Sequence, residues 1–160
     1  MMLTKERVLQ TIKNAKSTLG IEDMEFEVRF AKAESKIGKR AEIFIWSRKS
    51  AEIVLYPEAT FFSVRHELCH AKLFRMGVPL TKTEMDLELF PIQENYTRMV
   101  VIVEYYINEL QRRFFEEYYA VDEAGTPQLP PFSGLPELPQ EEFTAEQVNS
   151  LIEIAKERRS

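Results

Sequence analysis

Several kinds of residue are scarce in this chain, and each scarcity narrows what the chain can be. Its 160 residues include one cysteine, Cys69, so no disulfide can form within the chain. No stretch reaches the roughly 18 consecutive apolar residues of a membrane-spanning helix, and the start, MMLTKERVLQ, lacks the apolar run of a signal peptide. The net charge of -5 argues against nucleic acid as the main partner. We therefore expect a cytoplasmic protein with neither a membrane nor a nucleic-acid partner.

Histidine is equally scarce, and the two histidines lie four residues apart in FFSVRHELCHAKLFRM, residues 61–76. Each residue of an α-helix turns about 100°, so His66 and His70 share one face, one turn apart. Two neutral imidazoles so placed can bind one zinc ion at about 2.0 to 2.1 Å. Glu67 lies about 100° further round, where its carboxylate reaches a water beside the metal more easily than the metal itself. The pattern H-E-x-x-H therefore predicts a zinc site with Glu67 as general base.

The spacing of apolar residues indicates that this stretch is helical. Phe61, Val64 and Leu68 form a stripe at helical spacing, and Gly77 with Pro79 ends the helix. Two histidines at this spacing can also be coincidental core or surface residues, which is the alternative to a metal site.

The rest of the chain predicts an α+β fold with a small, mainly antiparallel three-stranded sheet. The sheet packs on the histidine-bearing helix and on a long later helix. Thr4 caps a first helix that ends at Gly20, and MEFEVRF, residues 24–30, alternates like a half-buried strand. Two β-rich runs, AEIFIW and AEIVLY, form a hairpin over residues 41–56. The expected organisation is a domain over residues 1–120, a Pro-rich extended tail over 121–143 and an amphipathic C-terminal helix over 144–160.

Catalytic zinc sites use three protein ligands, and both histidines are already assigned. The third must be an acid or a thiolate. Cys69 points about 100° away from His70, which favours packing, although a ligand role stays open. Four acids with polar neighbours are interpreted as solvated: Glu84, Asp86, Glu88 and Glu94. Glu104 is the single carboxylate within MVVIVEYYI, residues 99–107, and an unpaired carboxylate there would be costly to bury. We therefore predict Glu104 as the third ligand.

A β-hairpin, an H-E-x-x-H helix and a later glutamate resemble the gluzincin metallopeptidases, and the short chain is most similar to the minigluzincins. The resemblance covers about residues 41–108. It implies that His66, His70 and Glu104 bind zinc and that Glu67 is the general base. Gluzincins often have an acid one turn after the glutamate ligand, where this chain has Asn108, whose amide can still accept a hydrogen bond from a ligand imidazole and orient it. The strand with Ile43, Phe44 and Ile45 would then pair with substrate. The family's transition-state stabilisers have no match in this chain that can be placed; Tyr105 and Tyr106 adjoin Glu104, and packing is the favoured interpretation of both, with a stabilising role as the alternative.

The resulting prediction is a zinc-dependent endopeptidase with one zinc ion and a peptide or protein substrate. The alternative is an inactive scaffold of the same family that binds zinc or a peptide partner without hydrolysis. Some minigluzincins are latent, so the tail over residues 121–143 is expected either to occupy the cleft of this chain or to wrap its surface.

Overall fold

The computed structural model describes residues 3–117 and 132–156. Within these ranges the chain has five helices and one three-stranded sheet, which confirms the α+β class. The chain forms two compact units, Met1–Lys72 and Leu73–Ser160, a division that the sequence did not predict. Among the described residues, no helix is long and apolar enough to cross a membrane.

The first unit begins with helix α1, Lys5–Leu19, whose two ends follow from its sequence. The Thr4 side chain accepts a hydrogen bond from the Arg7 backbone N–H, which satisfies one of the open donors of the first turn. Gly20 adopts φ 70°, a left-handed conformation that glycine takes without a steric cost, and ends the helix. Val8, Ile12 and Leu19 are buried, so the predicted apolar stripe faces the core.

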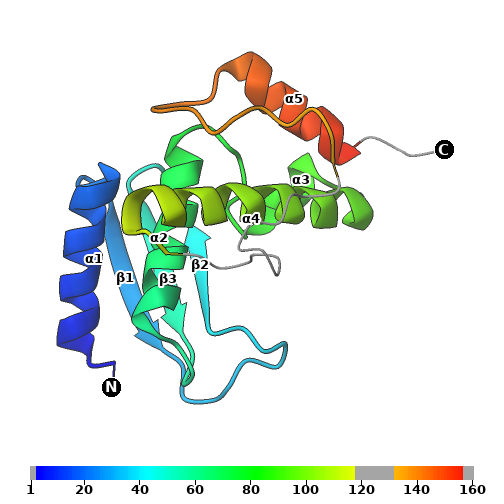
Figure 1. The fold of residues 1–160 in the computed structure, drawn as a ribbon. Coiled ribbons are helices and arrows are strands. Elements are labelled where there is room, and N and C mark those ends of the chain that lie inside the picture. Colours follow the sequence, from blue (N-terminus) through cyan, green and yellow to red (C-terminus); the bar gives the residue numbers. More distant parts are fainter. Residues whose placement is uncertain (1–2, 118–131, 157–160) are drawn as a thin grey trace, which may run out of the picture. The chain divides into compact units, whose positions relative to one another are not determined.

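The sheet consists of β1, Glu25–Phe30, β2, Ala41–Ile45, and β3, Ser50–Leu55, in the order β1-β3-β2. Figure 1 shows β3 between its two neighbours. The predicted hairpin is present, because β2 and β3 pair antiparallel, with Ile43 opposite Ile53. Ile53 and Val54 are both buried although they project to opposite faces, which suits the central strand of a sheet.

The sheet is mixed rather than mainly antiparallel, which corrects one expectation. Strand β1 pairs parallel to β3, with Val28 opposite Ile53. The hairpin occupies only one edge of β3, and β1 adds to the other edge instead of joining β2. Because β1 and β3 both run opposite to β2, their pairing is parallel.

The two faces of this sheet differ in polarity. One face carries Ile43, Ile45 and Ile53, which are buried, and Phe26 on the same face has the Lys16 ammonium of α1 at 6.0 Å from its ring centroid. The opposite face carries charged residues of all three strands, including the ion pair of Arg29 with Glu52 at 3.7 Å. This alternation is the half-buried pattern that the strand sequences predict.

Helix α2, Phe61–Arg75, begins in the first unit and contains both histidines. The second unit follows with α3, Glu84–Leu89, α4, Gln93–Phe115, and α5, Ala145–Lys156 (Figure 1). Helices α4 and α5 pack together, and the Arg98 side chain donates a hydrogen bond to the carbonyl of Ile154 at 2.9 Å. The long helix and the C-terminal helix were thus predicted, each within a few residues of its ends.

Helix α3 was not predicted, and Asp86 within it is not solvated. Asp86 is 3% exposed, and its carboxylate accepts hydrogen bonds from the backbone N–H and hydroxyl of Thr81, both at 2.8 Å, and from the Lys82 N–H at 2.5 Å. Polar neighbours suggested exposure, whereas these neighbours are the donors that permit its burial.

The described part of the Pro-rich tail, residues 132–142, has no helix or strand and is hydrogen-bonded to side chains of α4. The Tyr106 hydroxyl donates to the carbonyl of Pro136 at 2.6 Å, and the Arg113 guanidinium donates to the carbonyls of Leu138 and Pro139. Phe143 then packs edge-on against the Tyr106 ring. The rest of the predicted tail, residues 121–131, lies outside the described residues.

Candidate metal centre

The first turn of α2 is held by a pair of side chains that sets where the helix starts. The Ser63 backbone N–H donates to the Thr60 hydroxyl at 3.2 Å, and the Thr60 backbone N–H donates to the Ser63 hydroxyl at 3.1 Å. This reciprocal arrangement matches a capping box, with serine in the place usually taken by glutamate or glutamine. The cap fixes the start of the helix within about three turns of both histidines, so it helps to fix the direction in which they project.

His66, Glu67 and His70 form the one cluster of potential metal ligands found among the described residues. One donor atom from each side chain lies within 4.8 Å of the donor atoms of the other two. The two imidazole rings have centroids 5.2 Å apart and stand 74° to each other. The helical spacing therefore brings together the three residues that the sequence motif singled out.

The cluster is largely removed from solvent. Glu67 and His70 are 3% and 4% exposed, and His66 is half-buried. The Oε2 atom of Glu67 and the Nε2 atom of His70 are buried atoms without a hydrogen bond in the described part of the chain, although both residues make other interactions. Burial at a low local dielectric strengthens the interaction of such groups with a cation.

Cys69 lies on the same helix but does not join the cluster. Its side chain is fully buried, and its sulfur is not among the donor atoms that come together at His66 and His70. This agrees with the interpretation of Cys69 as small buried filler.

Glu104 and Asn108 lie on α4 in the second unit, one turn apart and therefore on one face of that helix. Both are half-buried, and Glu104 makes interactions of its own. The Oδ1 atom of Asn108 is buried and accepts no hydrogen bond from any described residue. A buried acceptor of this kind is unusual, since nearly all are satisfied in folded proteins. The assignment of Glu104 as a ligand and of Asn108 as its helper stays a prediction.

Tyr106 is a packing residue, as one of the two interpretations held. It is fully buried in the second unit, where its ring contacts Phe143 and its hydroxyl donates a hydrogen bond to the carbonyl of Pro136. Burial raises the pKa of the Tyr106 hydroxyl, followed by a smaller effect of Tyr105. Burial also raises the pKa of Tyr105, which is half-buried. Both tyrosines are therefore neutral at ordinary pH.

The strand predicted to pair with substrate is β2, at one edge of the sheet. The Trp46 backbone N–H donates to the carbonyl of Ser50, and the Tyr56 backbone N–H donates to the carbonyl of Arg40. Arg40 and Trp46 flank β2, so the even-numbered residues of this stretch direct their backbone N–H and C=O groups toward β3. The backbone groups of Ile43 and Ile45 accordingly point to the open side, while both residues are buried and Phe44 is half-buried. Their contact with substrate stays a prediction.

Comparisons with protein-family models, with curated proteins and with solved structures found no match to this chain. The case for a function therefore depends on its own residues.

Two structural features, one at the start of α2 and one in α3, were missed in the sequence. The capping pair Thr60 and Ser63 is visible as T-x-x-S directly before the apolar stripe of α2, a pattern that would have found the start of the helix. The hydrogen bonds of Asp86 gave no comparable signal, because they depend on Lys82 adopting φ 59° in the preceding loop.

Proposed function

We propose that the protein is a zinc-dependent metallopeptidase whose centre is the His66, Glu67 and His70 cluster on α2. One observation carries this proposal: three side chains with the chemistry of two zinc ligands and one general base have their donor atoms within 4.8 Å of one another. They are largely buried on one helix, which is the setting in which H-E-x-x-H has catalytic meaning.

The residues present fit a zinc ion in donor type and spacing. Neutral imidazole nitrogen is a preferred zinc ligand at about 2.0 to 2.1 Å, so two nitrogens bound to one ion lie at most about 4 Å apart. Side chains whose donor atoms already lie within 4.8 Å need only small rotations to satisfy that limit. Glu104 is proposed as the third ligand, which leaves one position for water.

The chemistry divides between the ion and this chain. Zinc bound there would polarise a peptide carbonyl and lower the pKa of a water molecule toward about 7. Glu67 would act as general base by taking a proton from a water molecule and as general acid by donating it to the departing amine. Its burial suits this work, because a carboxylate removed from bulk solvent exchanges protons mainly with the groups beside it.

Asn108 is proposed to orient a ligand imidazole. Its buried Oδ1 can accept a hydrogen bond from a ring N–H and so hold the tautomer that presents the other nitrogen to the metal. A neutral amide accepts this bond less strongly than a carboxylate, so the imidazole it orients is a weaker donor than one paired with an acid.

The experiment measures metal and cleavage separately. Wild type purified without chelator should contain about one zinc per chain, and His66→Ala should contain far less. Glu67→Gln, which removes the base but neither histidine, should keep its zinc and lose cleavage of a protein such as casein. Glu58→Gln, an exposed glutamate just before α2, is the matched control and should keep both.

The outcomes separate the peptidase from its alternatives. Zinc binding without cleavage in wild type would identify a zinc-binding scaffold. Equal metal content in wild type and His66→Ala would mean that the two histidines are ordinary packing residues and would refute the proposal.

A further inference from the structure

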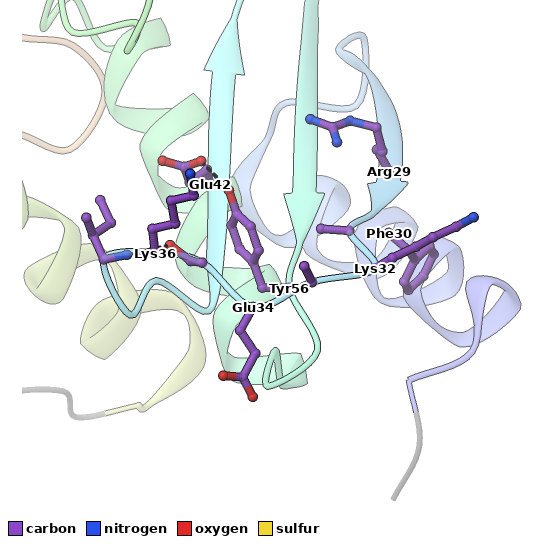
Figure 2. Close-up of a pocket in the computed structure, with 11 residues that line it drawn as sticks. Arg29, Phe30, Lys32, Glu34, Lys36, Glu42 and Tyr56 are labelled. Atoms are coloured by element: carbon purple, nitrogen blue, oxygen red, sulfur yellow. Dashed lines mark hydrogen bonds between the residues drawn. The ribbon is translucent and has the colours of Figure 1, made fainter.

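A pocket lies in the first unit, at the ends of the strands. It has a volume of about 660 Å3 and is formed where β1 continues into the loop over residues 31–37, opposite Glu42 and Tyr56 (Figure 2). All of its lining belongs to the first unit, and it contains neither histidine. The peptidase proposal leaves this pocket without a role.

Two carboxylates line the pocket, those of Glu34 and Glu42, and Glu42 already has its own donors. The Tyr56 hydroxyl donates to Glu42 at 2.7 Å, and the Lys39 ammonium lies 2.7 Å from the other carboxylate oxygen. The hydrogen bond to Glu42 is the main cause that raises the pKa of Tyr56, so the hydroxyl remains protonated. The negative charge of Glu42 is therefore largely offset within the pocket itself.

The positive charges at the rim outnumber the one exposed acid there, Glu34, which lies between Lys32 and Lys36 in the sequence. Lys32 and Lys36 are exposed, and within the described residues neither forms an ion pair. Figure 2 shows them on opposite sides of Tyr56. Residues 29–42 contain five basic and two acidic residues in a chain whose net charge is -5. This rim is therefore a local positive region on an acidic protein, which attracts negatively charged partners at short range.

Apolar side chains stand beside these cations. Ile37 is 74% exposed and Phe30 is 40% exposed. The turn that displays Ile37 is ordered by hydrogen bonds from the Ile37 and Gly38 backbone N–H groups to Ser35, and Gly38 adopts φ 74°. Exposed apolar residues next to free cations match a ligand that combines acidic with apolar side chains.

We propose that this pocket and its rim bind a segment of another protein that is rich in acidic and apolar side chains. An acidic peptide meets Lys32 and Lys36 with its carboxylates and covers Ile37 and Phe30 with its apolar residues. Nucleic acid fits less well, because the strongly negative remainder of the chain repels a continuous phosphate backbone. The pocket would hold a partner or a substrate at a place separate from the histidines.

Binding to a defined peptide tests this without any requirement for zinc or cleavage. The probe is a short fluorescein-labelled peptide of Asp and Phe residues, and a peptide of Asn and Phe residues serves for comparison. Fluorescence anisotropy at low salt measures the binding of each peptide to the Glu67→Gln chain. Lys32→Glu with Lys36→Glu should raise the Kd at least about fivefold. Added salt should weaken wild-type binding, because exposed charges are screened.

The matched control is Lys5→Glu with Lys13→Glu, two exposed lysines on α1 whose reversal gives the same net charge. The control should change the Kd less than about twofold. Three results would overturn the proposal: equal losses in the two double variants, equal binding of the Asn and Asp peptides, or tighter binding of a single-stranded oligonucleotide. None of these bears on the peptidase proposal, since the measurement uses a chain without its general base.

Discussion

Glu104 is the single residue on which the composition of the proposed metal site depends most. With only two histidines in the chain, a third protein ligand must come from another residue type. We predict that Glu104→Ala lowers zinc affinity by at least about 100-fold, because it removes a ligand rather than a group that merely orients one. Competition with a zinc-binding dye measures this. Glu94→Ala, an exposed acid on the same helix, should leave the affinity unchanged.

Retention of full affinity in Glu104→Ala would assign the third position to another acid while leaving the two histidines in place. The zinc affinity of the Asn108→Asp variant tests the proposed role of residue 108. A carboxylate at this position should tighten zinc binding if residue 108 supports an imidazole, and should have no effect if it does not.

Tyr106 makes the stability of the second unit depend on pH. Burial raises its pKa above the ordinary value of about 10, so the folded chain holds this proton more firmly than the unfolded chain. Its contribution is complete below about pH 10 and is lost as the pH rises above that value. We therefore expect the free energy of unfolding, measured by urea titration, to fall above about pH 10. Tyr106→Phe should make this fall smaller.

Tyr106→Phe should also cost about 1 kcal/mol at neutral pH, because the hydrogen bond from its hydroxyl to the carbonyl of Pro136 is lost. Tyr105→Phe is the neighbouring control and should cost less, since the Tyr105 ring is only half-buried. An equal cost in both variants would mean that the hydrogen bond to Pro136 contributes little.

At the scale of elements, the start of α2 should matter more than its exposed position suggests. Thr60→Ala removes the side chain that accepts the Ser63 N–H, and the loss of such a cap costs about 1 kcal/mol. Thr60→Ser keeps a hydroxyl at the same place and should restore most of the loss. Urea unfolding of the three chains gives the comparison. If Thr60→Ala is as stable as wild type, the capping pair does not define the start of the helix.

The helices and strands were predicted where local chemistry decides them. Thr4 and Gly20 mark α1, and the run of alternating residues marks β1, because caps and periodicity act within a few residues. The parallel partner of β1 was not predictable in this way, since it depends on which edge of β3 remains open after the hairpin forms. Helix α3 was missed because the burial of Asp86 depends on donors from Thr81 and Lys82 in the preceding loop, whose backbone conformation the sequence did not indicate.

The candidate site shows the same division. His66, Glu67 and His70 were predicted together because helical geometry alone fixes their separation. The tail interactions of Tyr106 and Arg113 were not, because their acceptors lie 25 to 30 residues further along the chain. Helix geometry therefore predicts the cluster on α2, whereas contacts between segments far apart in the sequence, such as those of the tail outside the site, require the structure.

At the scale of the whole molecule, the C-terminal segment has a structural role that bears on any regulatory one. Leu151, Ala155 and Phe143 are buried, and the carbonyls of Pro136, Leu138 and Pro139 accept hydrogen bonds from α4. On a helix turning about 100° per residue, Tyr106 and Arg113 project roughly 180 to 200° away from Glu104. The described part of the tail is therefore held on the face of α4 opposite Glu104.

This arrangement predicts that truncation near Ala120 lowers the melting temperature by several degrees, because it removes α5 and exposes its buried contacts. In a truncated chain, the effect of lost stability on peptide cleavage could not be separated from the effect of lost inhibition. A chain with a specific protease site inserted within residues 121–131 avoids the difficulty, since cutting there removes no residue. We expect the cut chain to keep its melting temperature, because residues 132–156 retain their own contacts with α4. An increase in peptide cleavage on cutting would then identify inhibition by the tail, and unchanged cleavage would assign the segment a purely structural role.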